Sequence, residues 1–400
     1  MSRKWYAPAA LAAAAVVALS GCAETGGGGE GAAGADGESV KIMVFGSFTQ
    51  PPFPLAQIKT AAEAAVQRIN DEGGIGGKTP IELVSCDDEM SANGATACGR
   101  QAAQEDVAAV VGAFTLFGDS IVPLLEAADI PYIGNAAISE LESTSEISFP
   151  VMTAGGPNFA GAVSLQQQGC ESFVIAANES ATAQAAYDSF GVPSAEAIGL
   201  PTGYVPYPAN TTDFSSVAAR IADQTNCVIY GGGPQDSAAL ITALDQTGED
   251  FIHVALSTIA FPESSLAQFG EAADGIQVLS PFEFPSTGGE AITQAVEDMK
   301  AVDPDVVIDE TAVNAYAAVL IFAQAAEALD GDITGAALLE LLNTPGTTID
   351  TGLFAPTDFA ADAGFFPPIP RAVGSVYQPY VAENGVYVPN GDPLELAGTF

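Results

Sequence analysis

The sequence predicts an α/β protein with two doubly wound parallel-sheet lobes joined by a multi-strand hinge. Short apolar runs alternate with amphipathic segments between Val40 and Val111, which is typical of successive βα units. The alternation restarts after the glycine-containing residues 154–157, and a long apolar segment, Glu310–Leu329, follows the second series of units. Right-handed crossovers between parallel strands build one sheet from each series, so we expect two lobes.

The first βα units are well marked in the sequence. Val40–Phe45 is a short apolar run that stops at Gly46, as expected of a strand buried on both faces. Leu55–Asn70 carries apolar residues at helical spacing, and the glycine-rich residues 72–78 mark the end of this helix. Ile81–Ser85 is the next predicted strand. These units begin the sheet of the first lobe.

The remaining elements are predicted from the same apolar periodicities. In the first lobe they are the strands Val107–Gly112, Tyr132–Gly134 and Phe149–Thr153 and the helix Asp119–Ala128. In the second lobe they are the strands Ser172–Ala176, Glu196–Leu200, Cys227–Tyr230, His253–Leu256 and Gly275–Leu279 and the helices Asn158–Gln168, Ala183–Phe190, Thr211–Gln224 and Ser237–Thr247. The last are the helices Glu310–Leu329 and Thr334–Leu342 and a hairpin of Val373–Val381 with Val386–Val388.

The expected lobes are discontinuous in the sequence, because the chain crosses between them three times. The crossings are expected near residues 154–157, near residues 280–285 and near Arg371. The first lobe is therefore expected to contain residues 40–153 and 283–370, and the second lobe residues 154–282 and 371–400. Several crossing segments between two lobes make a hinge.

The amino terminus has the features of a secretion signal. A basic start, Ser2-Arg3-Lys4, precedes the short apolar run Ala9–Leu19, so residues 1–21 are expected to be a signal peptide. The run ends in Leu19-Ser20-Gly21-Cys22, which resembles the bacterial lipobox; this resemblance implies cleavage before Cys22 and a lipid on its thiol. A plain secretory signal is the alternative. Residues 22–39 are rich in Gly and Ala and are expected to be a flexible tether.

The charge balance is strongly acidic. The chain has 10 Lys and Arg against 50 Asp and Glu, a formal net charge of −40. Such a surface repels nucleic acid and anionic membranes, so we expect the chain to bind neither through its own surface. The composition suits a salty or acid-tolerant extracellular setting.

Four cysteines remain beside Cys22, and an even number in an exported chain predicts two disulfides. Cys86 ends a predicted strand and Cys98 lies in the helix that follows, so a bridge there would pin the intervening loop. Cys170 and Cys227 lie at the starts of two strands that would be neighbours in the second sheet. Free buried thiols are the alternative for each pair. No pair has the two-residue spacing of a zinc site, and we expect no cofactor.

Only loops that follow strands reach the carboxyl edge of a parallel sheet, where ligands of open α/β sheets bind. None of the loops predicted there contains Lys or Arg, so a solute carboxylate would be held by hydroxyl and backbone N–H groups. The aromatic residues of these loops, with Tyr204, Tyr207 and Phe261, would give an apolar wall. The expected ligand-binding residues are Ser47, Phe48, Phe53, Phe114, Thr115, Leu116, Phe117, Asn135, Ala136 and Ala137 in the first lobe and Asn178, Glu179, Gly232, Gly233, Ser257 and Thr258 in the second.

A family resemblance is carried by Ile69–Glu89, which reads INDEGGIGGKTPIELVSCDDE. It is similar to a signature of the branched-chain amino-acid class of extracellular solute-binding proteins, which serve ABC importers. Weaker similarity extends over nearly the whole mature chain. The resemblance implies the type I periplasmic-binding-protein fold, closure of two lobes on a small solute, and delivery of that solute to an ABC importer permease. It also implies a monomer, lipid-anchored at the extracellular face of the membrane.

The family's binding loops can be carried over only in part. The loop that holds the ligand's carboxylate and amine falls on Phe114–Phe117, with Thr115 as its hydroxyl, and the next falls on Asn135–Ala137. In the second lobe Asn178-Glu179 lacks the family's aromatic, and Ser257-Thr258 stands where an amine-binding acid is expected. Glu179 or Asp119 is left as a partner for a ligand amine. The ligand is expected to be a hydrophobic or branched-chain amino acid or an amide. Asp87-Asp88 follows the signature and is expected to cap loops.

Catalytic chemistry finds little support. Gly77-Lys78-Thr79 lacks the first glycine of a phosphate loop and precedes a strand. Gly118-Asp119-Ser120 resembles the start of a secreted esterase family, but the single histidine, His253, lies in a strand-like run, so a hydrolase has no base. The leading hypothesis is an importer's solute-binding receptor. A sensor of the same fold and a secreted hydrolase are the alternatives.

Overall fold

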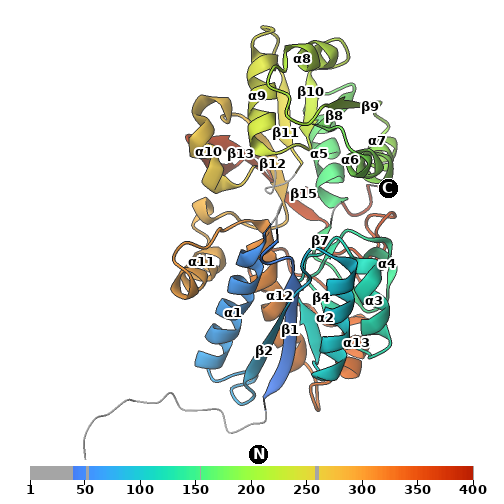
Figure 1. Ribbon diagram of the computed structural model, residues 1–400, viewed down its shortest axis with the longest axis vertical. Helices are drawn as coiled ribbons and strands as arrows, with labels where there is room; N and C mark the ends of the chain where they lie inside the picture. Colours follow the sequence, from blue (N-terminus) through green and yellow to red (C-terminus); the bar gives the residue numbers. More distant parts are fainter. Residues whose placement is uncertain (1–38, 51–53, 154, 257–260, 400) are drawn as a thin grey trace, which may run out of the picture. The chain divides into compact units, whose positions relative to one another are not determined.

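The computed structural model describes residues 39–50, 54–153, 155–256 and 261–399, which belong to one compact unit, Ala35–Phe400 (Figure 1). Several predictions fall outside these ranges and stay predictions. They are the signal peptide 1–21, the lipidated Cys22, most of the tether 22–39, and the ligand-binding residues Phe53, Ser257 and Thr258.

The first large sheet has five parallel strands in the order β2-β1-β3-β4-β6. Side chains alternate along β1: Ile42 and Val44 pack in one buried cluster, and Met43 and Phe45 pack in another. Helices cover both faces, as expected of a doubly wound sheet. Its strands are β1 (Val40–Gly46), β2 (Ile81–Asp87), β3 (Ala109–Val111), β4 (Tyr132–Ile133) and β6 (Ser148–Phe149). Its helices are α1 (Ala56–Asp71), α2 (Ala92–Gln104), α3 (Gly118–Glu126), α4 (Glu140–Thr144), α11 (Glu290–Val302), α12 (Glu310–Glu327) and α13 (Gly335–Leu342).

Helix α12 packs against the ends of β3 and β4, where glycines allow it to approach. A Cβ on Gly112 would lie 2.6 Å from the Cα of Ala315, and a Cβ on Gly134 would lie 2.4 Å from the Cβ of Ala318. These two glycines also have φ angles of +60° and +64°, which side chains disfavour. The sequence interval between β4 and α12 is long, so this packing joins a returning segment to the first sheet.

The second large sheet has the order β14-β13-β12-β11-β10-β8-β9, and β15 pairs with β13. Strands β8 to β12 are parallel, and β13 joins them antiparallel. Its strands are β8 (Phe173–Asn178), β9 (Thr202–Tyr207), β10 (Cys227–Tyr230), β11 (Ile252–Ala255), β12 (Gln277–Ser280), β13 (Val376–Glu383), β14 (Val386–Pro389) and β15 (Leu394–Glu395). Its helices are α5 (Gly156–Gln167), α6 (Ala181–Ala186), α7 (Val192–Ile198), α8 (Ser215–Ala222), α9 (Pro234–Asp245) and α10 (Glu263–Phe269).

A short two-stranded sheet, β5 (Ala136–Ala137) with β7 (Met152–Thr153), lies next in sequence to the first crossing. The two-sheet α/β architecture agrees with the predicted fold class. The residue boundaries of the two lobes stay a prediction.

One predicted strand is wrong. Glu196–Leu200 belongs to a helical stretch that runs through α6, a π-helical turn at Tyr187–Gly191 and α7, and Gly199 ends it with a φ of +69°. The strand lies later, at Thr202–Tyr207, where β-branched and aromatic residues alternate. Tyr204 and Tyr207, which were expected in a loop, therefore lie in strand β9. The predicted strand Phe149–Thr153 is two short strands, β6 and β7, of different sheets, and the prediction also missed α4, α10, α11, β5 and β15.

The structure confirms both predicted disulfides. Cys86–Cys98 joins the end of β2 to α2, with a Cα–Cα distance of 5.6 Å. Cys170–Cys227 joins the residues just before β8 and at the start of β10, with a Cα–Cα distance of 6.3 Å. Strands β8 and β10 are direct neighbours in the sheet, as expected.

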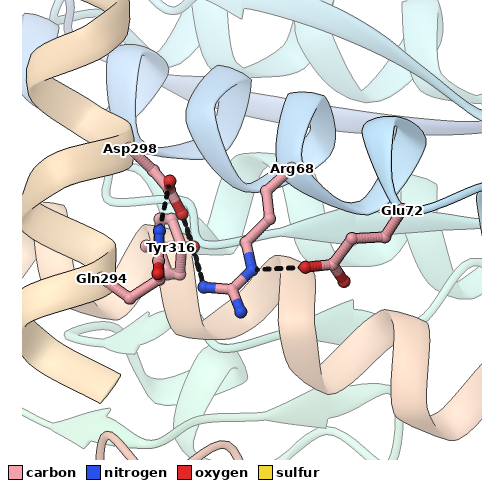
Figure 2. Close-up of polar contacts among 5 residues, drawn as sticks. All are labelled: Arg68, Glu72, Gln294, Asp298 and Tyr316. Carbon is pink, nitrogen blue, oxygen red and sulfur yellow. Dashed lines mark hydrogen bonds and ion pairs between the residues drawn. The ribbon is translucent and has the colours of Figure 1, made fainter. Parts of the chain in front are cut away.

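A polar network ties the returning helix α11 to the first lobe (Figure 2). The Tyr316 hydroxyl on α12 donates to Asp298 Oδ2 on α11 at 2.5 Å, and Gln294 Nε2 donates to Asp298 Oδ1 at 2.8 Å. Arg68 on α1 lies 3.5 Å from Asp298 and pairs with Glu72 at 3.2 Å. Burial, and then the hydrogen bond to Asp298, raise the pKa of Tyr316, so this phenol keeps its proton and donates.

Candidate functional site

The carboxyl edge of the first sheet is organised around one buried carboxylate, Asp88. Its Oδ1 accepts a hydrogen bond from Ser47 Oγ at 2.5 Å, and its Oδ2 accepts one from Thr115 Oγ1 at 2.6 Å. The backbone N–H of Met90 donates to Oδ1 at 2.9 Å. Asp88 is 0% exposed, so it joins the loops after β1, β2 and β3 from inside. The hydroxyl protons of Ser47 and Thr115, both expected to serve a ligand, are thus committed to Asp88.

Asp87 organises the outer part of the same loops. Its carboxylate accepts hydrogen bonds from Thr49 Oγ1 at 2.7 Å, from the N–H of Glu89 at 2.9 Å and from the N–H of Phe48 at 3.3 Å. Asp87 and Asp88 therefore act as loop-capping residues, as the sequence predicted. The disulfide of Cys86 lies immediately before them and fixes the start of this loop.

The loop after β3 supplies the apolar part of this edge. Phe114 and Phe117 are half-buried, and Leu116 is 51% exposed. The Thr115 hydroxyl also accepts a hydrogen bond from the N–H of Phe117 at 3.1 Å, which fixes the loop's shape. A free apolar side chain beside two half-buried rings suits the wall of a solute pocket.

The loop after β4 is fixed by hydrogen bonds to Ser148 and to helix α12. Asn135 Nδ2 donates to Ser148 Oγ at 3.0 Å, and Asn314 Nδ2 on α12 donates to the carbonyl of Gly134 at 2.6 Å. Ala136 and Ala137 form β5 and are buried. These predicted contact residues therefore offer backbone groups rather than side chains to the edge of the sheet.

Glu142 lies beneath the same loop and is 0% exposed. Its carboxylate accepts the N–H of Ser139 at 3.0 Å and of Ile138 at 3.3 Å, and the Tyr132 hydroxyl lies 3.3 Å away. Burial raises the pKa of Glu142 to about 7, although its hydrogen bonds with Ser139 oppose the shift. The sequence Ser139–Glu142 carries a readable capping-box signal, but nothing in it indicated such deep burial.

The carboxyl edge of the second sheet has a different chemistry. Asn178, at the end of β8, donates from Nδ2 to Asp236 Oδ2 at 3.0 Å, and Glu179 beside it is exposed. Gly232 and Gly233 follow β10 and lead into α9. Tyr207, expected in a loop, is the last residue of β9, and its ring is buried. The structure thus brings Asn178, Gly232 and Tyr207 together, which only the correct strand assignment would have predicted.

No Lys or Arg side chain belongs to the described loops that follow the parallel strands of either sheet. Arg371, near the predicted third crossing, lies over the ring of Phe149 at 5.1 Å and donates to the carbonyl of Ser148 and to Asn343 Oδ1. The Arg371 guanidinium is therefore engaged by Phe149, Ser148 and Asn343, and the Arg220 guanidinium donates to the carbonyl of Pro206 in β9.

The single histidine, His253, has a structural role in the second sheet. The Nδ1 atom of His253 lies 2.6 Å from the Tyr230 hydroxyl, and burial lowers the pKa of His253. Within the ranges that the structure covers, no cluster of His, Cys, Asp or Glu is arranged to hold a metal ion. No described helix combines the length and the apolar character needed to cross a bilayer.

Comparisons with known proteins identify the fold. A structure of a branched-chain amino acid ABC transporter protein from Thermus thermophilus with bound valine has a TM-score of 0.73 at 16% identity, covering 89% of this chain and 96% of that one. A fatty acid ABC transporter substrate-binding protein from Thermomonospora curvata has a TM-score of 0.71 at 20% identity, covering 91% and 94%. A solute-binding protein from Rhodopseudomonas palustris HaA2 in complex with p-hydroxybenzoic acid has a TM-score of 0.69 at 17% identity, covering 90% and 98%.

At these identities the structures establish a shared fold, and two of them hold chemically different ligands, valine and p-hydroxybenzoic acid. No curated protein matches the sequence significantly. The model of the periplasmic binding protein family, however, matches residues 46–368, which is most of the chain. The sequence alternative of a secreted hydrolase is therefore wrong, and the chain belongs to the periplasmic binding protein family, whose members bind solutes and are not enzymes.

Proposed function

We propose that the chain is a lipid-anchored extracellular receptor that delivers a small solute to an ABC importer permease by hinge closure of its two lobes. The solute is a hydrophobic or branched-chain amino acid or an amide. Membership of the periplasmic binding protein family supports this importer role, as do three proteins of ABC transporters that share the fold. The receptor acts as a monomer and needs no cofactor.

One observation supports the solute class: the described loops at both carboxyl edges combine apolar side chains with backbone, hydroxyl and carboxylate groups and contain no Lys or Arg. Because the Ser47 and Thr115 hydroxyls donate to Asp88, a solute carboxylate held there must be satisfied mainly by backbone N–H groups. Its apolar part would meet Phe114, Leu116 and Phe117. Multiply charged anions such as phosphate esters are disfavoured, because their usual partners are Arg and Lys.

Membrane attachment through Cys22 is part of the proposal. A Cys22→Ser variant should leave the cell surface and be found in the medium, and labelling with a radioactive fatty acid should mark the wild type only. If the wild type takes up no label, Cys22 carries no lipid and residues 1–21 are a plain secretory signal.

A thermal-shift screen over amino acids, amides and aromatic acids tests the solute class. A solute at about 100 times its Kd should stabilise the folded state by roughly 3 kcal/mol. Stabilisation by hydrophobic amino acids or amides supports the proposal, and stabilisation by aromatic acids alone contradicts it.

Leu116→Ala tests whether the apolar wall contacts the solute. Because Leu116 is half exposed, its truncation should change the free energy of unfolding by less than about 0.5 kcal/mol. Loss of its contact with the solute should raise the Kd by roughly fivefold, equivalent to about 1 kcal/mol. Val386→Ala is the control, since Val386 is 40% exposed on an antiparallel strand. Equal effects of both substitutions on the Kd would contradict this placement.

A further inference from the structure

The segment Gly232–Asp236, here called the α9 loop, contains a cluster of free backbone donors. The N–H of Gly231 donates to the carbonyl of Ala176, and the N–H of Ser237 donates to the carbonyl of Gly233. Between them, the N–H groups of Gly232, Gly233, Gln235 and Asp236 find no acceptor in the part of the chain that the structure describes. Proline at position 234 has no N–H, and no side chain caps the helix. Four donors are therefore available at the start of the 12-residue helix α9.

A buried side chain adds an independent, fifth donor. The Tyr207 side chain is 1% exposed, and its hydroxyl oxygen would lie 1.9 Å from a Cβ built on Gly232. The hydroxyl therefore touches the backbone of the α9 loop, yet it has no hydrogen-bond partner among the described residues. Unlike the fully enclosed Ser237 hydroxyl, which also lacks a partner, the Tyr207 hydroxyl keeps some solvent access, so an acceptor that enters from solvent can reach it. Burial, and then the nearby Asp236, raise the pKa of Tyr207, which keeps its proton available.

The acidic groups nearby do not use these donors. Asp236 Oδ2 accepts its hydrogen bond from Asn178, and Glu179 on the adjacent loop is exposed. An ammonium group would find Asp236 but would leave all five donors unpaired. A group with two acceptor oxygens would pair with several of them, with the positive end of the helix dipole behind it.

We propose that the α9 loop and the Tyr207 hydroxyl form a carboxylate-binding half-site in the second lobe. This inference rests on the proposed function, because it states which end of the solute the second lobe holds. The solutes are then carboxylic acids with an apolar body, and an amino group is optional. The opposite wall, with Leu116 and its neighbouring rings, receives the apolar body.

The half-site can be tested without knowing the transported solute. Sodium acetate is titrated into the isotopically labelled protein, with sodium chloride at equal ionic strength as the reference. The amide resonances of Gly232, Gly233, Gln235 and Asp236 should move saturably with acetate only. The same resonances should respond weakly in Tyr207→Phe. Absence of an acetate-specific response in the wild type overturns the half-site.

Two substitutions delete single donors with little other change. Tyr207→Phe removes a hydroxyl that has no partner in the protein, so the melting temperature should stay equal or rise. Gly233→Pro removes one N–H at a residue whose φ of −69° already suits proline, and no atom lies within 4 Å of a Cβ there. Gly233→Ala is the matched control, because it adds a Cβ and keeps the N–H.

The solute panel contains L-leucine, octanoate and 4-hydroxybenzoate, each with its primary amide. Every acid that binds should bind at least fivefold more weakly to Tyr207→Phe and to Gly233→Pro, and Gly233→Ala, which keeps the N–H, should weaken binding less than Gly233→Pro. Amides should bind more weakly than the acids. Equal binding of acid and amide, or unchanged binding by both donor-deleting variants, overturns the half-site. A clear acetate response without binding of any panel member supports the half-site and contradicts the proposed solute class.

Discussion

At the scale of single residues, two buried carboxylates do different work on the same edge of the first sheet. Asp88 gathers hydroxyl and N–H donors from three loops, whereas Glu142 supports one loop and faces the hydroxyl of Tyr132. Glu142 also explains the glycine that starts α3, because a Cβ on Gly118 would lie 2.2 Å from its carboxyl carbon. The loop that carries the predicted contacts Asn135–Ala137 therefore rests on a group that titrates near neutrality.

The raised pKa of Glu142 makes stability fall as pH rises. In the unfolded chain Glu142 ionises near pH 4.5, but in the folded protein it does so near 7. Its contribution is therefore complete below about pH 4.5 and is lost as pH rises through about 7, a difference of roughly 3 kcal/mol. Relative to the wild type, Glu142→Gln should become progressively more stable over this range, because it cannot ionise. Urea unfolding at several pH values measures the difference.

Subtracting the wild-type free energy of unfolding at each pH removes the contributions of the other carboxylates, because they titrate alike in both proteins. Glu140→Gln is the control, since it removes an exposed carboxylate from the same helix. A difference between Glu142→Gln and wild type that stays constant with pH would show that the carboxyl is not held protonated.

At the scale of elements, close packing of α12 onto the first sheet depends on glycine. Gly134→Ala should destabilise the protein for two reasons: a left-handed φ of +64°, and a Cβ only 2.4 Å from that of Ala318. Gly76→Ala separates these causes, because Gly76 has a φ of +60° but open space around its Cβ position.

Backbone strain alone should make Gly76→Ala cost about 1 kcal/mol. Gly134→Ala should cost at least about 3 kcal/mol, because the overlap adds to the strain and α12 has to move. Denaturant midpoints give both values. Equal costs would mean that α12 yields easily to the added methyl group.

Element types were predictable wherever a periodic pattern was long. The strands at Val40 and Ile81 and the helices α1 and α12 were found to within about two residues, because each shows a clear apolar run or helical periodicity in the sequence. The strand predicted at Glu196–Leu200 failed because a short apolar run fits a helix equally well, and only the turn at Gly199 separates α7 from β9. The error moved Tyr207 from a loop into a strand end.

The candidate site was predictable as a set of loops but not as a set of contacts. That Ser47 and Thr115 donate to Asp88 depends on three loops meeting in space, and no local spacing indicates it. Both disulfides were predictable, because Cys98 lies in the helix that directly follows the strand ending at Cys86, and strand order brings Cys170 close to Cys227. The free donors of the α9 loop follow from a proline and glycines at a helix start, a signal that the sequence contains.

At the scale of the whole molecule, the large negative net charge is the main electrostatic influence on stability. The chain carries 50 acidic residues against 10 basic ones, and in the described part four Lys or Arg ion pairs occupy Glu63, Glu72, Glu105 and Asp298. Most carboxylates therefore have no cationic partner, and their mutual repulsion opposes the compact state.

This repulsion predicts that salt stabilises the fold. Raising NaCl from about 0.05 M to about 1 M shortens the screening length from over 10 Å to about 3 Å, so the free energy of unfolding should rise by roughly 2 kcal/mol or more. Sucrose at equal osmolality controls for general exclusion effects. The triple variant Asp223→Asn, Glu249→Gln and Asp250→Asn removes three exposed charges, and its stability should depend less steeply on salt. Because screening acts on charge alone, the same slope in wild type and variant would assign the salt effect to the solvent instead of the acidic surface.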